Sequence, residues 1–228
     1  MGTPISTQAL IFDMDGTMID SMPFHAQSWV EFCRRHRLQM DLADMMRRTT
    51  GRTGTECMGE LFGRSMSTAE ALPYVLEKEA IYRALFAPMF AEVKGFQAFA
   101  AQARSMGLKI GVGTAGDRHN IAFAMGHLQM AQAPQAIVGG DEGLPGKPEP
   151  AIFLEAAQRL AVTACECIVF EDAPFGIEAA RRAGMRAVAI CTTHSAAELA
   201  GSHVLAAVPD YEALLKQEFL EKLHVVIA

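Results

Sequence analysis

The sequence has few cysteines, and none of them lies in a pattern that would give cysteine a function. Its 228 residues include five cysteines, an odd number, and no Cys-x-x-Cys pair occurs. No apolar segment of the kind that directs secretion opens the chain. These absences argue against a disulfide framework and against a zinc or redox motif, because both need paired cysteines. We therefore expect reduced, structural thiols and a cytoplasmic location.

Long basic or apolar runs are also missing. The chain has 20 lysines and arginines against 26 acids, which gives a net charge of −6 at pH 7. Nucleic acids and anionic membranes attract basic stretches, and a transmembrane helix needs about 20 consecutive apolar residues. We therefore expect neither a nucleic-acid partner nor a membrane partner. With 50% hydrophobic residues, the chain can bury one sizeable core and a smaller second unit, and we expect it to be a monomer.

Two acids follow a short apolar segment near the start of the chain. Residues 9–12 are all apolar, which is typical of a buried parallel strand, and Asp13 and Asp15 come soon after them. Alternate side chains of an extended segment share a face, so both carboxylates can project from the carboxyl end of the strand, where Gly16 lets the chain turn. Two carboxylates so close repel one another unless a cation neutralises them or one is protonated. Both conditions suit phosphoryl transfer.

The hydrophobic pattern changes from strand to helix after Asp20. For about seventy residues the apolar positions follow helical spacing. Glycines, a proline and residues that favour helix N-caps, such as Ser21, separate this part into segments. Four helices are expected, at residues 21–37, 41–50, 53–62 and 68–86.

From Gly95 onward, helical and strand patterns alternate, which predicts right-handed crossovers and a parallel sheet. Strands are expected at residues 108–113, 136–138, 167–170, 187–190 and, at an edge, 204–207. Helices are expected at residues 96–106, 121–128, 150–161, 176–183 and 211–223. The sequence therefore predicts an α/β protein with a Rossmann-like three-layer parallel sheet core in residues 1–17 and 91–228. An α-helical cap is inserted in it at residues 18–90.

Two further strand ends offer groups that could hold a phosphate. The second strand ends before Thr114 and Ala115, where a hydroxyl and the main-chain amides of a helix start can bind phosphate oxygens. Lys147 lies between glycine and proline residues, and Pro148 and Pro150 restrict the backbone around it. This restriction lowers the cost of holding one positive charge in place.

Another pair of acids, Glu171 and Asp172, ends the strand expected at residues 167–170. Neighbouring strand residues point to opposite faces, so both acids can enter one site only if the chain has already turned. The alternative for Asp172 is a helix cap. Oxygen ligands from Asp13, the main-chain carbonyl of Asp15 and Asp172 would suit Mg²⁺, and Glu171 would bind the metal directly or through water.

These four motifs, in this order, resemble those of the haloacid-dehalogenase-like hydrolase superfamily. The resemblance is strongest to the branch with a helical cap that contains β-phosphoglucomutase and sugar-phosphate phosphatases. It implies that Asp13 is the nucleophile and forms an aspartyl-phosphate, and that Asp15 is the general acid and base. It also implies that Lys147 pairs with both the nucleophile and the phosphate.

Two cap residues are candidates for contacting the substrate. His25 fits the cap-hinge pattern of that branch, and Arg52 lies in the Thr-Gly-Arg-Thr-Gly connection between two cap helices. Packing or solvent exposure is the alternative for each of them. Asp15 disfavours the dehalogenases and phosphonoacetaldehyde hydrolases of the superfamily, which replace this acid. Lys78, the only lysine of the cap, adds no support for the Schiff-base chemistry of the latter.

The expected activity is that of a Mg²⁺-dependent phosphatase for a small phosphorylated metabolite, with a sugar phosphate favoured. A β-phosphoglucomutase-type phosphomutase is the alternative, since both reactions pass through the same aspartyl-phosphate. The phosphomutases that this chain resembles carry a lysine where this sequence has Asp117, which reverses the charge that would bind a second phosphate. A non-catalytic module that binds a phosphate ligand is the least favoured reading, because every charged catalytic position is filled.

Overall fold

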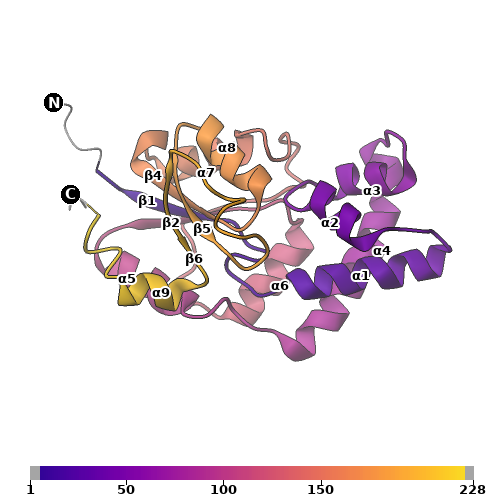
Figure 1. The fold of residues 1–228 in the computed structure, drawn as a ribbon, viewed down its shortest axis with the longest axis horizontal. Coiled ribbons are helices and arrows are strands. Elements are labelled where there is room, and N and C mark those ends of the chain that lie inside the picture. Colours follow the sequence, from indigo (N-terminus) through magenta and orange to yellow (C-terminus); the bar gives the residue numbers. More distant parts are fainter. Residues whose placement is uncertain (1–5, 224–228) are drawn as a thin grey trace.

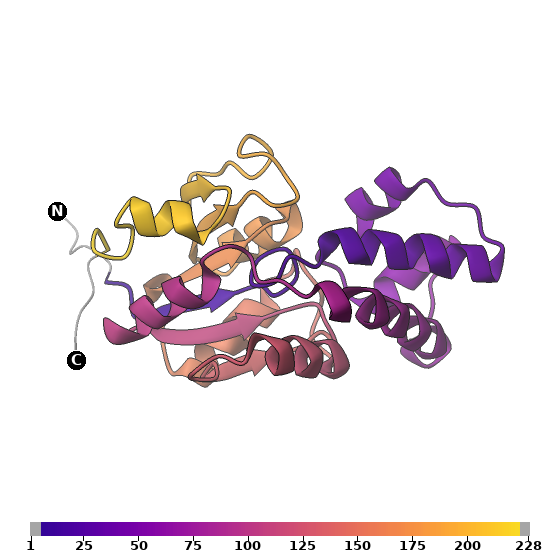
Figure 2. The same cartoon turned by 90° about the horizontal axis from the view of Figure 1, so that it is seen from below.

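The computed structural model describes residues 6–223 and consists of an α/β core with a helical cap at one end (Figure 1, Figure 2). The core contains one six-stranded sheet with the strand order β3-β2-β1-β4-β5-β6, and all neighbouring strands are parallel. The strands are β1 Ala9–Phe12, β2 Lys109–Gly113, β3 Ala136–Val138, β4 Cys167–Glu171, β5 Arg186–Ile190 and β6 Val204–Val208. The fold class predicted from the sequence is therefore confirmed.

Strand β1 lies in the middle of the sheet, and its residues alternate between two hydrophobic clusters. Leu10 and Phe12 face one cluster, whereas Ala9 and Ile11 face the other. Both faces of the strand are buried, which explains why its sequence is apolar throughout rather than alternating. The core therefore has three layers, with helices on each side of the sheet (Figure 2).

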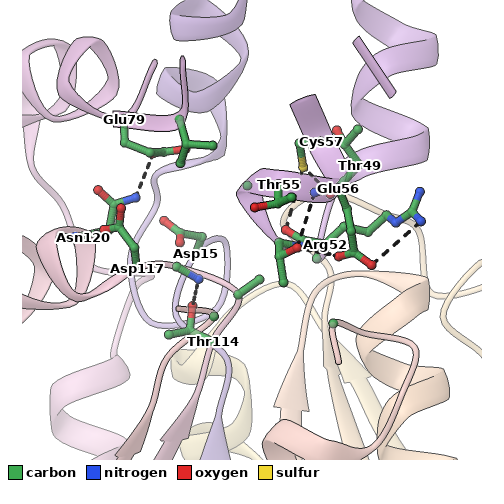
Figure 3. Close-up of a pocket in the computed structure, with 18 of the residues that line it drawn as sticks. Asp15, Thr49, Arg52, Thr55, Glu56, Cys57, Glu79, Thr114, Asp117 and Asn120 are labelled. Carbon is green, nitrogen blue, oxygen red and sulfur yellow. Dashed lines mark hydrogen bonds and ion pairs between the residues drawn. The ribbon is translucent and has the colours of Figure 1, made fainter. Parts of the chain in front are cut away.

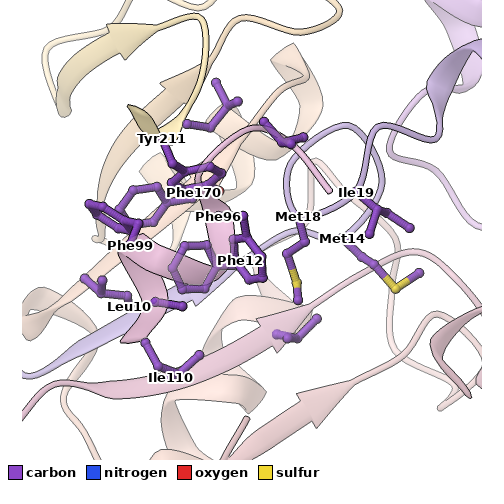
Figure 4. Packing of buried hydrophobic residues seen from close by; sticks show 14 of the residues in the cluster. Leu10, Phe12, Met14, Met18, Ile19, Phe96, Phe99, Ile110, Phe170 and Tyr211 are labelled. Atoms are coloured by element: carbon purple, nitrogen blue, oxygen red, sulfur yellow. The ribbon is translucent and has the colours of Figure 1, made fainter. Parts of the chain in front are cut away.

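The core helices divide between these two faces. Residues of α5, α6 and α9 belong to the cluster around Phe12, and residues of α7 and α8 belong to the cluster around Ile11. In the first cluster the ring of Phe12 stacks on Phe170 at 4.7 Å and meets Phe96 edge-on at 5.3 Å (Figure 4). The helices are α5 Phe96–Ser105, α6 Arg118–Leu128, α7 Ala151–Leu160, α8 Pro174–Arg182 and α9 Tyr211–Lys216.

The cap has its own hydrophobic cluster, in which Trp29, Phe32 and Met58 are buried. Its helices are α1 Met22–His36, α2 Leu42–Thr49, α3 Gly54–Phe62 and α4 Thr68–Phe86. The sequence sets where two of them begin, because Thr53 and Ser67 each form a capping box with the glutamate three residues later. Four cap helices at the predicted positions are thus confirmed.

The two connections between cap and core run side by side. The amide of Asp20 donates to the carbonyl of Ala91, and the amide of Val93 donates to the carbonyl of Met18, both at 3.0 Å. The cap is therefore joined to the core through a short paired segment. The domain boundaries predicted at residues 18 and 90 lie close to it and stay a prediction.

One predicted helix is too long. A helix was expected over residues 211–223, but α9 ends at Lys216. Glu218 has a positive φ of 52°, which ends the helical path, and Leu220 is then buried against the core. All five cysteines are free thiols, as predicted. No helix among residues 6–223 combines the length and apolar character needed to cross a membrane.

The substitution Phe12→Ala is expected to lower the free energy of unfolding by about 3–5 kcal/mol, because it leaves a cavity among closely packed rings. Urea denaturation followed by circular dichroism measures this change. Leu205→Ala, on β6, is the control, since Leu205 is 44% exposed and should cost less than about 1 kcal/mol. Similar losses for the two variants would contradict the central position assigned to Phe12.

Candidate active site

A cavity of about 510 Å³ lies between the cap and the carboxyl ends of the core strands. Its core wall contains Asp13 and Asp15 after β1, Thr114 after β2, and Glu171 and Asp172 at the end of β4. The register explains this grouping, since Phe12 pairs with Val112 on one side and with Phe170 on the other. The carboxyl ends of three neighbouring strands therefore meet at one edge of the sheet. This is where open α/β sheets bind ligands.

Lys147 holds two of the acids together. Its Nζ lies 2.5 Å from Oδ1 of Asp13 and 2.7 Å from Oε1 of Glu171. The lysine side chain is fully buried. Burial alone would lower the pKa of Lys147, but the carboxylates of Asp13 and Glu171 raise it above its usual value. The sequence prediction that Lys147 approaches Asp13 is therefore correct, and Glu171 is a second partner that the sequence did not indicate.

Asp172 completes a cluster of three buried acids with Asp13 and Glu171. One possible ligand atom from each lies within 4.8 Å of those of the others. Burial raises the pKa of Asp13 to about 8 although Lys147 opposes it, and burial with the neighbouring Glu171 and Asp13 raises that of Asp172 well above its usual value. The chain turns directly after Glu171, the last residue of β4. Glu171 and Asp172 can therefore both reach one site, because the turn that the sequence analysis required for this is present.

The charge and chemistry of this cluster fit a magnesium ion. Three carboxylates surround one lysine, so two negative charges are left unbalanced when all three acids are ionised. Hard carboxylate oxygens are the ligands that Mg²⁺ prefers, and a divalent cation would balance the charge. Asp13 and Asp172 are the best candidates for direct ligands. Glu171 already accepts hydrogen bonds from Lys147 and from the amide of Ala173, at 2.8 Å for the latter.

Two glycines make room for these acids. Gly16 has a φ of +75°, and a Cβ atom there would lie 2.3 Å from Oδ2 of Asp172. A Cβ atom on Gly176 would lie 1.7 Å from Oε1 of Glu171. Any larger residue at either position would displace a carboxylate of the cluster. The glycines therefore fix the close approach of the main chain to the site.

Thr193, after β5, supports Asp172 and was not identified from the sequence. Its hydroxyl lies 2.6 Å from Oδ2 of Asp172 and 2.8 Å from the main-chain oxygen of the same residue. Such a contact orients a carboxylate toward a metal. The threonine lies after a strand without any acid or lysine, so the sequence gave no reason to single it out.

Asp15 is turned away from the acid cluster, toward the cap. Its Oδ1 accepts hydrogen bonds from Ser21 at 2.7 Å and from Tyr82 at 3.2 Å, and it lies 3.0 Å from Nε2 of His25. Burial tends to raise the pKa of Asp15, but His25, together with Ser21 and Lys78, lowers it below its usual value. The carboxylate of Asp15 is thus separate from the candidate metal ligands, and only its carbonyl, as predicted, remains available for that role.

A chain of polar contacts links His25 to the core through the cap. Nδ1 of His25 lies 2.7 Å from Nζ of Lys78, which also contacts Glu79 at 2.9 Å. The side-chain amide of Asn120, on core helix α6, donates a hydrogen bond to Glu79 at 2.8 Å. The sequence singled out His25 for this region but gave no site role to Lys78, Glu79 or Asn120. Only their proximity in space reveals the network.

Figure 3 shows the two sides of the opening. Asp15 and Thr114 lie on the core side, with Glu79 above one flank and Arg52 and Glu56 on the other. The hydroxyl of Thr114 accepts a hydrogen bond from the amide of Gly116 at 3.0 Å, and Ala115 follows it in the cavity wall. Both residues therefore lie in the cavity wall, and the phosphate-binding role predicted for them stays a prediction.

Arg52 and Asp117 are both engaged with the protein itself. Arg52 lines the cavity, as predicted, but its guanidinium group forms an ion pair with Glu60 at 2.9 Å. The carboxylate of Asp117 caps α6 by accepting hydrogen bonds from the amides of His119 and Asn120, both at 2.9 Å. Asp117, which stands where the phosphomutases that this chain resembles carry a lysine, is thus the N-cap of α6.

Comparison with known proteins gives one family. The model for haloacid dehalogenase-like hydrolases matches residues 7–184. The chain is 34% identical over 196 residues to validoxylamine A 7'-phosphate phosphatase of Streptomyces hygroscopicus subsp. limoneus, covering 86% of this chain and 91% of that protein. It is 33% identical over 187 residues to fructose-1-phosphate phosphatase YqaB of Escherichia coli (strain K12), covering 78% and 94%.

A solved structure agrees in fold. The crystal structure of β-phosphoglucomutase from Clostridium difficile superposes with a TM-score of 0.80 and covers 95% of this chain and 98% of that one. The two sequences are 24% identical. The likeness extends over both the core and the cap, so it supports the arrangement of the fold and leaves the reaction to other evidence.

Mg²⁺ is expected to raise the midpoint of thermal unfolding of the wild-type protein and to change that of Asp172→Asn little. A ligand that binds only the folded state adds about 2.7 kcal/mol of stability at a concentration one hundred times its Kd. Without metal, Asp172→Asn should be at least as stable as the wild type, because it removes a buried negative charge. Differential scanning calorimetry with Mg²⁺ and with EDTA measures both effects.

Glu212→Gln is the matched control for this experiment, because Glu212 is an exposed acid on α9 whose recorded ion pair is with Lys216. It should keep the full response to Mg²⁺. Equal responses in Asp172→Asn and in the wild type would show that the acid cluster is not the metal site.

Proposed function

The chain belongs to the haloacid dehalogenase-like hydrolases, and from this we propose that it is a Mg²⁺-dependent phosphatase that hydrolyses a small sugar phosphate through an aspartyl-phosphate. The observation that carries the proposal is the contact of 2.5 Å between Lys147 and Asp13, inside a cluster of buried acids that fits a divalent cation. The two phosphatase relatives named above act on phosphorylated small molecules, which favours the same substrate class here.

In the first step, a carboxylate oxygen of Asp13 attacks phosphorus, and the bond from phosphorus to the leaving oxygen breaks. The attacking carboxylate and the phosphate are both anionic, so nearby positive charge has to offset their repulsion. Lys147 supplies one such charge, and the amides and hydroxyl at Thr114 and Ala115 can bind phosphate oxygens. Asp13 and Asp172 would hold Mg²⁺, and the bound ion would supply the rest of the charge neutralisation.

Asp15 is proposed to move the protons. It protonates the leaving oxygen in the first step. In the second step water attacks phosphorus, the bond from phosphorus to Asp13 breaks, and Asp15 takes the proton from the water. The ionised form, which His25 and Ser21 favour, is the form that the second step needs. For the first step the carboxyl group has to carry a proton. Nε2 of His25, at 3.0 Å, can deliver it when Nδ1 takes a proton from Lys78 at 2.7 Å, and the second step returns that proton.

We favour a phosphatase over a β-phosphoglucomutase-type phosphomutase. A phosphomutase must bind a bisphosphate, which needs positive charge at both ends of the substrate. Asp117 presents a negative charge at one such position and is fixed as the cap of α6. Arg52 is already paired with Glu60. Both facts support hydrolysis by water.

We further propose that the enzyme acts as a monomer in the cytoplasm on a small phosphorylated metabolite, without nucleic-acid or membrane partners. The net charge of −6 and the absence of a long basic run support this proposal. The contributions of Arg52 and His25 to substrate binding remain predictions, which their positions in the cavity wall support.

The variant Asp13→Asn is expected to lose at least about a thousandfold in kcat, because it removes the nucleophile. Phosphate release from a panel of sugar phosphates, with and without EDTA, measures this loss. EDTA should abolish turnover by the wild type, and added Mg²⁺ should restore it. Asp44→Asn, which changes a partly exposed cap residue outside the cavity wall, should retain full activity. Turnover that survives chelation or the loss of Asp13 would exclude the mechanism.

A phosphorus NMR time course separates the two activities. With β-glucose 1-phosphate and a trace of glucose 1,6-bisphosphate, we expect inorganic phosphate to form faster than glucose 6-phosphate. The physical reason is that, in the part of the chain that the structure describes, the cap cations Arg52 and Lys78 in the cavity wall are each paired with an acid. Faster formation of glucose 6-phosphate would identify a phosphomutase instead.

A further inference from the structure

The cap end of the cavity is lined by apolar side chains. Trp29 of α1 and Met58 of α3 contribute to this wall, together with Leu72 and Leu76 of α4. Leu72 and Leu76 are one helical turn apart and therefore share a face. They are 48% and 38% exposed, which is unusual for leucines beside an otherwise buried cluster. A leaving group that enters the cap meets this apolar surface.

The charged groups of the cavity wall are already paired. Among the described residues, Arg52 and Lys78 of this wall each have a carboxylate at 2.9 Å, that of Glu60 and that of Glu79. Arg118 is 81% exposed and lies 3.9 Å from Asp141, so water screens this pair. Lys147, behind the wall, is paired with Asp13. A second phosphate or a carboxylate that enters the cap would have to displace Glu60 or Glu79 from its partner. That exchange leaves a partly buried carboxylate unpaired and is unfavourable.

Several uncharged polar groups of the cap wall are engaged as well. The hydroxyls of Thr49 and Thr50 donate to main-chain carbonyls of the preceding helical turn, both at 2.7 Å. Glu56 accepts hydrogen bonds from the amide and the hydroxyl of Thr53, at 2.9 and 2.7 Å. These three threonines therefore offer few free donors to a leaving group, whereas the hydrocarbon surface of the cap stays available.

We propose that the cap end of the cavity binds an uncharged, apolar part of the leaving group. The preferred substrates are then monophosphates of sugars that carry an apolar substituent, rather than free sugar monophosphates or bisphosphates. This inference rests on the proposed phosphatase activity, and it concerns the leaving group, whereas the residues at the core end concern the phosphate. Burial of a hydrocarbon group against Leu72 and Leu76 would supply the preference.

The test compares kcat/KM for three substrates: glucose 6-phosphate, phenyl β-glucoside 6-phosphate and glucose 1,6-bisphosphate. The phenyl glucoside phosphate should exceed glucose 6-phosphate by about tenfold, the range expected when an apolar group enters an apolar pocket. The bisphosphate should be the poorest of the three. Equal values for the first two substrates, or a preference for the bisphosphate, would overturn the proposal.

Variants locate the preference. Leu76→Asn should reduce the ratio of the phenyl glucoside phosphate to glucose 6-phosphate by about fivefold, because the ring loses its apolar contact. Leu76→Met, which keeps the apolar surface, should retain the ratio. Val30→Asn is the matched control, since Val30 is 51% exposed on the cap but lies outside the cavity wall. A ratio that Leu76→Asn leaves unchanged would also overturn the proposal.

p-Nitrophenyl phosphate, assayed in parallel, separates this proposal from the proposed function. If no substrate releases phosphate, the proposed phosphatase activity is wrong. If p-nitrophenyl phosphate and glucose 6-phosphate are hydrolysed but the phenyl glucoside phosphate has no advantage, only the inference about the leaving group is wrong.

Discussion

The contact of Lys147 with Asp13 and Glu171 is the interaction on which the rest of the site depends. Three acids and one lysine are buried together, which no fold tolerates unless each charge has a partner. Loss of the lysine would leave two buried carboxylates unpaired, at a cost of about 3–5 kcal/mol. The same excess of negative charge that makes the cluster costly in the absence of metal gives it affinity for a divalent cation. The proposed binding of the metal would thus follow from the charge balance of the core.

This cluster could be predicted from the sequence because the backbone alone brings it together. Asp13 and Glu171 each lie at the end of an apolar segment, and the carboxyl ends of adjacent parallel strands meet at one edge. The strands and the four cap helices followed from hydrophobic periodicity and from capping residues such as Thr53 and Ser67. Helix α9 was predicted too long. It ends at Lys216, shortly before Glu218 with its positive φ, and no local sequence pattern predicts that φ.

The contacts between cap and core could not be predicted, because they join side chains far apart in the sequence. Asn120 contacts Glu79 across 41 positions, and Lys78 contacts His25 across 53. Each of these residues alone has an ordinary explanation on a helix face. The role of Thr193 could not be predicted either, because only the structure shows its hydroxyl 2.6 Å from the carboxylate of Asp172. Such roles arise from packing and not from any motif.

The two halves of the cavity differ in character: the core half is charged, and the cap half exposes apolar side chains. The core half contains the acids and Lys147, to which we assign the binding of the phosphate and the metal, and several polar groups of the cap half are engaged with the core or within the cap. His25 contacts Asp15, Lys78 contacts His25, Asn120 donates to Glu79, and Arg52 pairs with Glu60. Under the proposed preference for an apolar leaving group, recognition rests on fit and on burial of apolar area against the cap. A few substitutions on α4 would then change the substrate preference without disturbing the chemistry.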